Sequence, residues 1–378
     1  VYKRQSLLTV NPWKTRSVHR LFVYTEHGLY PWLVEKFLSM AKGIGCRFIV
    51  DPFIGSGVVA VEAQRMGFNV VGIDSNPWSL VVTRAKTTKL DFNNLLEKVY
   101  ILMDSDSLEP YIPSNRLEAY HPRDILHRLG VIRRFIEDFS DPEKNLLLTV
   151  FGSIVERYSY LKRTPAPELS RGKLPKGDPV EYFLGEFIRA INDLGSHSFN
   201  GVVVTIWADS TMWLPERICC LLTSPPFTNN VDYIRHTQLQ LLWSGLARDS
   251  NDLGYLRDLQ IPACVATARS WKMEYLNRDL IKIMEAIKGK MAKGYRKYLK
   301  QYFYYMRRHF ELLYERLEGE AWYTIGDSLL GNAYIPTHKL LMKIAMDIGF
   351  KTDLERIGSR KHFSKELGLY LLRLYIKN

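Results

Sequence analysis

The stretch Arg47-Phe-Ile-Val-Asp-Pro-Phe-Ile-Gly-Ser-Gly57, followed by Asn69-Val-Val-Gly-Ile-Asp74, decides the fold expected for this chain. Its first five residues form a short apolar run that predicts a buried strand, and the glycines predict a tight turn. We expect a helix from Val58 to about Met66. The second run predicts another strand, and Pro77 then opens a further helix at a position that tolerates proline. This strand–turn–helix–strand order is typical of a parallel α/β unit.

Later segments extend the same sheet. The strand candidates are residues 202–207, 218–223, 321–326, 352–357 and 368–376. The first two of these are continuously apolar, which predicts strands covered on both faces. A helix is expected at 337–348, between the strand candidates at 321–326 and 352–357. These elements predict a large α/β domain with a mostly parallel sheet.

Two long stretches between these elements are predicted to be helical insertions. We interpret residues 1–378 as a single domain with insertions at 90–198 and 246–317. The first insertion has apolar residues at helical spacing and is a candidate for target recognition. The second is basic, because the part from Trp271 to Phe310 holds eleven Lys or Arg residues against three acidic ones.

The composition of the 378 residues excludes several classes of protein. A hydrophobic content of 46% excludes a disordered chain, and no apolar run approaches the roughly 20 residues that span a bilayer. Four cysteines are too few for a disulfide scaffold and lack the CxxC spacing of zinc sites, so we expect a cytoplasmic protein without a metal. We interpret Cys219 and Cys220 as core residues. The net charge of +12, from 52 basic and 40 acidic residues, suits a polyanionic partner.

The glycine-rich turn predicts a nucleotide-type cofactor. Gly55 and Gly57 let the backbone approach a ligand, and the helix that follows offers unpaired N–H groups to an anion. Asp74 lies 17 residues after Gly57 at the end of a strand, where a carboxylate can accept both hydroxyls of a ribose. The alternative is a structural turn with a helix-capping aspartate. The strand context and the spacing favour the cofactor.

A second motif, Thr223-Ser-Pro-Pro-Phe227, directly follows an apolar strand. Its prolines stiffen the loop and remove two N–H donors, so the backbone presents carbonyl acceptors. The Ser224 hydroxyl and an adjacent carbonyl can together accept hydrogen bonds from one NH₂ group, and Phe227 offers a flat apolar face to a base. The alternative is an ordinary Pro-Pro loop. The pattern favours a site for an exocyclic amine that faces an electrophile.

Five segments in one compatible order carry a resemblance to a known family. Asp51-Pro-Phe-Ile-Gly-Ser-Gly57 resembles the cofactor motif of S-adenosylmethionine-dependent methyltransferases, and the Ser-Pro-Pro-Phe loop resembles the catalytic motif of amino-methyltransferases that act on bases. The segments 26–32 and 229–235 look like motifs that accompany these two, the second in DNA cytosine-N4 enzymes. Ile325-Gly-Asp-Ser328 with Ile335-Pro-Thr337 resembles their fifth-strand region. The resemblance implies a Rossmann-like methyltransferase sheet with an antiparallel last strand, and S-adenosyl-L-methionine as the cofactor.

The resemblance also assigns roles to individual residues. The catalytic residues are expected to be Ser224, Pro225, Pro226 and Phe227. The cofactor-binding residues are expected to be His27, Tyr30, Asp51, Phe53, Gly55, Gly57, Asp74 and Asp209. Among these, Asp74 would hold the ribose and Asp209 the adenine amine. The cofactor's methyl group is already electrophilic, so neither a metal nor a covalent nucleophile is needed.

We expect the substrate to be an exocyclic amine of a nucleic-acid base, with cytosine N4 in DNA as the first candidate. Serine at the first position of the catalytic motif is associated with cytosine, and the lack of a Pro-Cys motif argues against methylation of cytosine C5. A base must leave its helix to enter such a pocket. The residues expected to grip the nucleic acid lie in the second insertion: Lys288, Lys290, Lys293, Arg296, Lys297 and Lys300.

Other interpretations stay open on sequence alone. The basic residues can also form a solvated helix face whose neighbouring tyrosines pack into the core. The same chemistry fits cytosine N4 in ribosomal or other structured RNA. A non-catalytic nucleic-acid-binding protein with a relic methyltransferase fold is a third reading, which cofactor binding would exclude. Methylation of a protein glutamine is a further alternative, but it usually goes with Asn-Pro-Pro-Tyr rather than the Ser-Pro-Pro-Phe of this chain.

Overall fold

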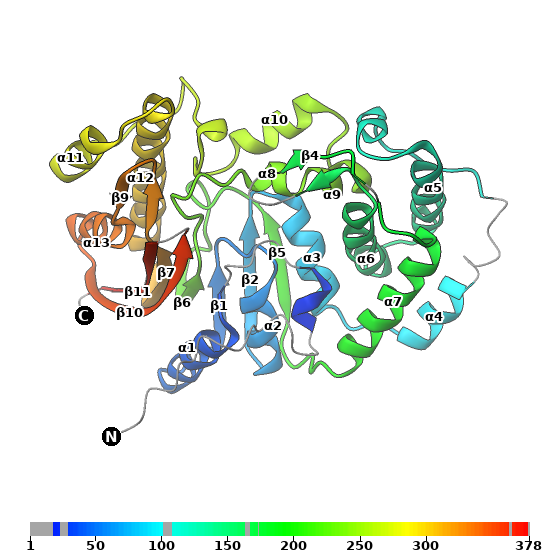
Figure 1. Ribbon diagram of the computed structural model, residues 1–378. Helices are drawn as coiled ribbons and strands as arrows, with labels where there is room; N and C mark the ends of the chain where they lie inside the picture. The colour runs from blue at the N-terminus through cyan, green and yellow to red at the C-terminus, as the bar shows by residue number, and fades with distance from the viewer. Residues whose placement is uncertain are drawn as a thin grey trace.

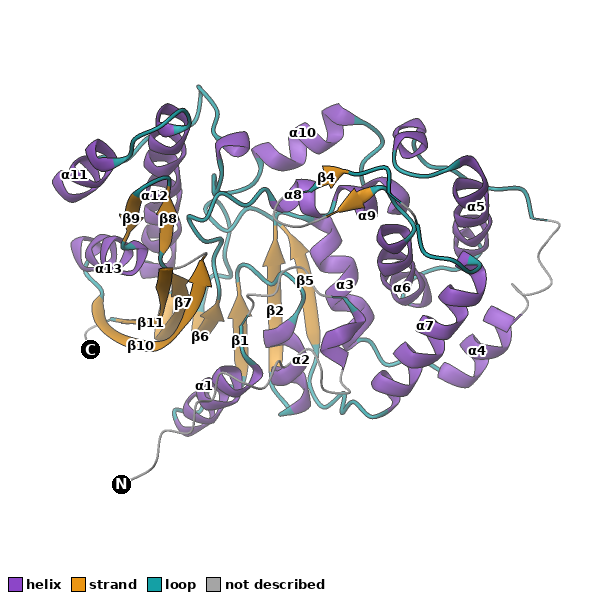
Figure 2. Ribbon diagram, in the orientation of Figure 1, coloured by secondary structure: helices purple, strands orange, loops and turns teal. Residues whose placement is uncertain are grey.

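A seven-stranded sheet forms the centre of the protein, in a computed structural model that describes residues 18–22, 29–100, 108–162, 167–172, 174–362 and 365–376 (Figures 1 and 2). The strands lie in the order β10-β11-β7-β6-β1-β2-β5. Their bounds are β1 (Phe48–Asp51), β2 (Asn69–Asp74), β5 (Val203–Trp207), β6 (Ile218–Thr223), β7 (Leu317–Gly326), β10 (Lys351–His362) and β11 (Lys365–Tyr375). Every predicted strand lies in this sheet.

Strand directions confirm a mostly parallel sheet with an antiparallel last strand. β5, β2, β1, β6 and β7 are parallel neighbours, whereas β11 pairs antiparallel with both β7 and β10. From β1 the chain builds outward to β2 and β5 on one side, and then to β6 and β7 on the other. In open α/β sheets, ligands bind at the carboxyl ends of the strands where the order reverses in this way. The two predicted motifs follow β1 and β6, the strands at that point.

Helices cover both faces of the sheet. One hydrophobic core joins α1 (Pro31–Gly43) and α2 (Val58–Arg65) to sheet residues such as Ile49. The other joins α12 (Ala292–Tyr314) and α13 (Thr337–Ile348) to sheet residues such as Val50. Successive residues of a strand point to opposite faces, so the apolar run of β1 serves both cores. The predicted helix at 337–348 matches α13.

A helical layer stands beside the β5 end of the sheet (cyan and green in Figure 1). Its core contains buried residues of α3, α5, α6, α7 and α9, and α3 also packs on β2 and β5. The bounds are α3 (Pro77–Thr87), α4 (Phe92–Tyr100), α5 (Arg123–Glu137), α6 (Glu143–Arg157), α7 (Pro179–Gly195) and α9 (Gln238–Ser244). Residues 90–198 hold 14 basic against 17 acidic side chains. The positive charge of the chain therefore lies elsewhere.

The basic segment 246–317 contains α10 (Ser250–Asp258), α11 (Arg278–Ala286) and α12, with 15 basic against 8 acidic residues. In α12, the side chains of Tyr298, Tyr302 and Phe303 are buried in the core on the sheet. These aromatic side chains therefore pack inward. Because α12 leads into β7, which runs parallel to β6, its first turn lies at the carboxyl ends of the strands (Figure 1).

Shorter elements complete the described chain. They are η2 (Val18–Leu21), η4 (Asn115–Ala119), β3 (Leu161–Lys162), β4 (Glu168–Leu169), α8 (Tyr233–His236), η5 (Val265–Thr267), β8 (Ser328–Leu330) and β9 (Ala333–Ile335). β3 pairs with β4 and β8 pairs with β9, each in a two-stranded sheet. In the described parts of the chain, no helix is long and apolar enough to cross a membrane.

The structure corrects two expectations. The apolar run at 202–207 was expected to be covered on both faces, but β5 is the edge strand, with Val204 49% and Trp207 51% exposed. The reason is that β5 has a neighbouring strand on one side only and that residues 208–217 connect it to β6 without a helix, which leaves α3 as the helix that packs on it. Cys219 is not simply a core residue, because it forms a disulfide with Cys46, which lies two residues before β1; Cys220 is buried as expected.

Candidate functional site

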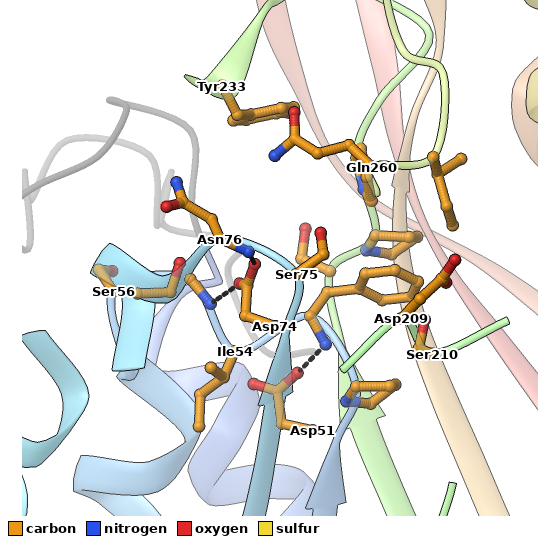
Figure 3. Close-up of a pocket in the computed structure, with 18 of the residues that line it drawn as sticks. Asp51, Ile54, Ser56, Asp74, Ser75, Asn76, Asp209, Ser210, Tyr233 and Gln260 are labelled. Atoms are coloured by element: carbon orange, nitrogen blue, oxygen red, sulfur yellow. Dashed lines mark hydrogen bonds between the residues drawn. The ribbon is translucent and has the colours of Figure 1, made fainter. Parts of the chain in front are cut away.

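A single pocket at the carboxyl ends of the strands collects both predicted motifs (Figure 3). The loop after β1 forms one wall and the Ser-Pro-Pro-Phe loop after β6 forms another. The carboxyl ends of β2 and β5 contribute two further acidic residues. The predicted site residues that line it are Asp51, Phe53, Gly55, Asp74, Asp209, Ser224, Pro225, Pro226 and Phe227.

The glycines of the loop are required by its backbone. Gly55 and Gly57 have φ angles of +50° and +80°, in the left-handed region that favours glycine. A Cβ on Gly57 would lie 2.8 Å from the Thr83 hydroxyl oxygen. The loop therefore closes tightly on α3, and α2 begins at Val58 with its first N–H groups at the pocket.

The carboxylate of Asp74 fastens this loop to β2. One carboxylate oxygen accepts from the Gly55 N–H at 2.9 Å and the other from the Asn76 N–H at 2.8 Å. Burial raises the pKa of Asp74 above its usual value. The Ser79 hydroxyl and the Ser75 N–H also donate to this carboxylate, which lies in the pocket lining and so faces any ligand bound there.

Asp51 links the two motifs. Its Oδ1 accepts from the Thr223 hydroxyl at 2.6 Å and from the Phe53 N–H at 3.1 Å. Burial raises the pKa of Asp51 to about 7 because an ionised carboxylate is poorly solvated there. A cationic ligand would stabilise the ionised form, so this end of the pocket suits a positive charge.

Asp209 and Ser210 form the polar end of the pocket next to β5. Asp209 accepts a hydrogen bond from the Thr211 N–H at 2.8 Å, and burial raises its pKa. The Ser210 hydroxyl oxygen is buried and has no hydrogen-bond partner among the residues that the structure describes. A buried polar atom without a partner is unfavourable, so its position at the pocket points to a ligand with polar groups at this end.

Two buried basic side chains behind the pocket had no signal in the sequence. The ammonium group of Lys86 donates to the backbone oxygens of Ser56 and Phe22, both at 2.9 Å, and so braces the glycine loop from below. Burial lowers its pKa to about 7. His309 of α12 contacts the Ser210 carbonyl oxygen at 3.0 Å and the Tyr323 hydroxyl at 2.7 Å. Burial lowers the pKa of His309 to about 4, which makes it a neutral support at physiological pH.

The Ser-Pro-Pro-Phe loop is fixed at both ends. Thr223 is bonded to Asp51, and the Thr228 hydroxyl lies 2.7 Å from the Thr337 hydroxyl and 3.1 Å from that of Ser328. These two partners belong to the segments that resemble the fifth-strand region. The Tyr298 hydroxyl donates to the Thr228 carbonyl oxygen at 3.2 Å. Ser224, in the middle of the loop, faces the pocket on a rigid support.

The ring of Phe227 is more enclosed than its predicted stacking role requires. It is 6% exposed, and a Cβ on Gly326 would lie 2.6 Å from a ring carbon. The Arg360 guanidinium lies over the ring, 5.3 Å from its centroid. A base that stacks on this face has to displace Arg360, a residue that sequence reasoning did not foresee.

Gly57 and Tyr30, two of the other predicted cofactor residues, lie next to residues that line the pocket. Gly57 is in the glycine loop. Tyr30 precedes α1 and stacks with Trp32, next to Leu29 in the pocket wall. His27 lies outside the described residues. The sequence missed Tyr233 and Gln260, which also line the pocket; Tyr233 falls within the run at 229–235 that resembled a family motif, whereas nothing marked Gln260.

The predicted nucleic-acid residues fall into two groups. Arg296 donates to the backbone oxygens of Met284 and Ile287, both at 2.8 Å, and Lys300 pairs with Glu274 at 3.1 Å. These two side chains stabilise the segment itself. Lys288, Lys290 and Lys293 are exposed, and Lys297 is half-buried. These four residues are grouped around the first turns of α12, at the pocket edge of the sheet.

Comparison with known proteins identifies distant methyltransferase relatives; no family model matches the chain. The chain is 25% identical to the type II methyltransferase M.MvaI of Kocuria varians, over 61% of this chain and 58% of that protein. It is 24% identical to the type II methyltransferase M.BsoBI of Geobacillus stearothermophilus, over 67% of this chain and 57% of that protein. Over 24% of this chain and 16% of the relative, it is 36% identical to the type II methyltransferase M.MjaII of Methanocaldococcus jannaschii.

The chain is thus a distant homologue of type II methyltransferases, and it spans somewhat more than half the length of M.MvaI and M.BsoBI. Among solved structures, the rRNA methyltransferase aviRa from Streptomyces viridochromogenes aligns with 91% of this chain and 86% of its own. The TM-score of that alignment is 0.27 and the sequence identity is 10%.

Proposed function

We propose that this protein transfers a methyl group from S-adenosyl-L-methionine to the exocyclic amine of a base in DNA, and that this amine is cytosine N4. The observation that carries the proposal is the pocket itself. Its two motif loops are joined directly, because the hydroxyl of Thr223, next to the Ser-Pro-Pro-Phe loop, donates a hydrogen bond to Asp51 at the start of the glycine loop. The relatives are type II methyltransferases, which supports methyl transfer and DNA as the substrate.

The residues of the pocket fit the proposed cofactor. Asp74 lines the pocket at the end of β2, where its carboxylate can meet the ribose hydroxyls, and Asp209 with the Ser210 hydroxyl, which has no partner among the described residues, suits the adenine edge. Asp51, whose ionised form a cation would favour, lies at the end suited to the charged methionine part. When bound there, S-adenosyl-L-methionine supplies an electrophilic methyl group.

The chain's own residues then orient the amine. The Ser224 hydroxyl oxygen and a backbone carbonyl oxygen beside it would accept the two N–H groups of the amine, which turns the nitrogen lone pair toward the methyl group. As the nitrogen–carbon bond forms, the sulfur–methyl bond would break to leave S-adenosylhomocysteine, and one of the two N–H protons would pass to solvent. Positioning of this kind depends on a loop that does not move, and Thr223 and Thr228 hold this loop at both ends. Serine at this position, rather than aspartate, supports cytosine as the base.

The charge distribution supports binding of DNA at the pocket edge. Residues 246–317 carry the excess of positive charge, and the exposed Lys288, Lys290 and Lys293 lie around the start of α12. Phosphate contacts from such residues supply much of the affinity for a duplex and make it depend on salt. The target base leaves the helix to reach Ser224.

The deciding experiment identifies the methylated nucleoside. The protein is incubated with methyl-labelled S-adenosyl-L-methionine and either duplex DNA or ribosomal RNA, and each nucleic acid is digested to nucleosides. We expect label in N4-methylcytosine from DNA. Label confined to adenosine, to RNA or to protein contradicts the proposed substrate, and the absence of any binding of the cofactor contradicts the proposed reaction.

A further inference from the structure

A short segment of the basic region lines the pocket on the side away from the strand ends that carry Asp51 and Asp74. Residues 259–261, which we call the roof segment, follow α10, and all three line the pocket. Figure 3 shows the Gln260 side chain and the neighbouring Tyr233 on the side of the pocket away from Asp51 and Asp74. No motif of the sequence includes the roof segment, and the proposed reaction assigns it no role.

The roof segment is held in place by a buried lysine. Lys272 is 4% exposed, and its ammonium group donates to the Gln260 carbonyl oxygen at 2.9 Å. The same group lies 5.4 Å from the centre of the Tyr305 ring, and the nearby Asp209 carboxylate attracts it. Lys272 therefore fixes the roof segment close to the end of the pocket that Asp209 marks.

The turn that carries Lys272 is itself tied to α12. The Gln301 side chain accepts from the Arg269 N–H at 3.1 Å and donates to the Lys272 carbonyl oxygen at 3.3 Å. Arg269 also pairs with Asp258, one residue before the roof segment, at 2.6 Å. A continuous set of polar contacts thus connects the roof segment to the helix that begins among the exposed lysines.

The side chain of Gln260 is placed to bind a ligand. In the described parts of the chain, no hydrogen bond from the protein reaches its amide, although its backbone N–H and carbonyl are both paired. The residues on either side are the apolar Leu259 and Ile261. An amide offers a donor and an acceptor, and apolar neighbours suit the flat face of a nucleoside base.

We propose that the roof segment forms the second wall of the nucleoside half of the methyl-donor site, with the Gln260 amide hydrogen-bonded to the nucleoside and Lys272 as its positioning residue. The proposal rests on the proposed function, because it assumes that the pocket holds S-adenosyl-L-methionine. The nucleoside is favoured over the target base because Lys272, which holds the Gln260 carbonyl, is also attracted by Asp209 of the same pocket, whereas the amine of the base belongs at Ser224. The methyl-donor site is then completed by the same basic region that is proposed to meet DNA.

Binding measurements with two ligands test this inference. S-adenosylhomocysteine contains the nucleoside and the amino-acid part, whereas methylthioadenosine contains the nucleoside alone. We expect Gln260→Leu to weaken the binding of both ligands by the same factor, about three- to tenfold, the usual effect of one lost neutral hydrogen bond. Asp51→Asn is expected to weaken S-adenosylhomocysteine alone. Calorimetric titration of each variant gives the dissociation constants.

The positioning role of Lys272 has its own comparison. Lys272→Met is expected to weaken the binding of both ligands by the same factor as Gln260→Leu. Lys272→Arg keeps the charge and the hydrogen-bond donors, so it is expected to retain most of the affinity. Lys282→Met, at an exposed position of α11, is the matched control and is expected to bind both ligands like the wild type. Equal melting temperatures of the ligand-free proteins exclude loss of folding as the cause.

The outcomes separate this inference from the proposed function. If the wild type binds both ligands and Gln260→Leu binds them equally well, the assignment of the roof segment is wrong while the methyl-donor site stands. If Gln260→Leu changes only the KM for DNA, Gln260 contacts the target base and the nucleoside assignment is also wrong. If the wild type binds neither ligand, the proposed function itself fails.

Discussion

Replacing Asp51 with asparagine is expected to stabilise the ligand-free protein at alkaline pH. Burial raises the pKa of Asp51 from 3.8 to about 7. Between these two values the folded state holds a proton on this group that the unfolded state has lost, so the free energy of unfolding of the wild type falls as the pH rises through this window. Asparagine has no such proton, and its side-chain oxygen can still accept the hydrogen bonds from Thr223 and Phe53.

The expected magnitude follows from the width of the window. Each pH unit within the window lowers the free energy of unfolding of the wild type by about 1.4 kcal/mol. About two pH units separate pH 5 from the pKa of Asp51 in the folded state. The stability advantage of Asp51→Asn over the wild type should therefore grow by about 2–3 kcal/mol between pH 5 and pH 8. Urea unfolding of both proteins at the two pH values measures it, and comparing the differences cancels any pH-independent effect of the substitution. An advantage that stays constant from pH 5 to pH 8 would refute the reasoning.

The same substitution is expected to weaken the binding of the proposed cofactor, because S-adenosyl-L-methionine is cationic and favours the ionised carboxylate. Affinity of the wild type should rise between pH 6 and pH 8 as Asp51 ionises near pH 7. The affinity of Asp51→Asn should change little over that range. Titration calorimetry at both pH values gives this comparison. A parallel rise in the two proteins would assign the pH dependence to another group.

Three further variants address the rest of the site. Ser224→Ala removes an acceptor for the amine and should lower the rate of methyl transfer to DNA about a hundredfold. The dissociation constant of S-adenosylhomocysteine should stay unchanged. A large loss of binding would instead place Ser224 in the cofactor site. Replacing Lys288, Lys290 and Lys293 together by alanine should reduce the salt dependence of DNA binding by about three on a log–log plot, whereas an unchanged slope would move the DNA surface elsewhere. Gly326→Ala places a Cβ 2.6 Å from the Phe227 ring and should cost about 1–3 kcal/mol of unfolding free energy in urea, and a neutral result would show that this ring is free to move.

The sequence predicted the central strands well because they are short apolar runs bounded by turn residues, whereas β7, β10 and β11 are longer than predicted. β2 and β6 and the helix α13 have the predicted bounds, and the antiparallel last strand follows the resemblance. The prediction was wrong for β5, since an apolar run does not reveal whether a helix covers it. Cys46 and Cys219 are 173 residues apart, so their spacing carried no sign of a disulfide.

The candidate site was predicted only where its residues follow strands directly. The carboxylates after β1, β2 and β5 and the loop after β6 meet because parallel strands end at one edge. Gln260 lines the pocket, Lys272 holds the Gln260 carbonyl and Arg360 lies over the Phe227 ring. All three come from segments whose packing decides their position, and no local pattern marks them. The tyrosines of α12 illustrate the same limit: the sequence allowed either an inward or a base-stacking role, and Tyr298 and Tyr302 proved to be buried.

The contacts of α12 give a physical reason to expect coupling between DNA and cofactor. Its first turns lie among the exposed lysines, Tyr298 bonds the carbonyl of Thr228 in the catalytic loop, and Gln301 holds the turn that fixes the roof segment. A duplex that binds at the start of this helix therefore acts on an element that touches both halves of the pocket. If DNA binding restricts the motion of the roof segment, the cofactor loses less conformational entropy when it binds. The affinity for the cofactor then rises without any direct contact between the two ligands. Thermodynamic linkage then requires the cofactor to raise the affinity for DNA by the same factor.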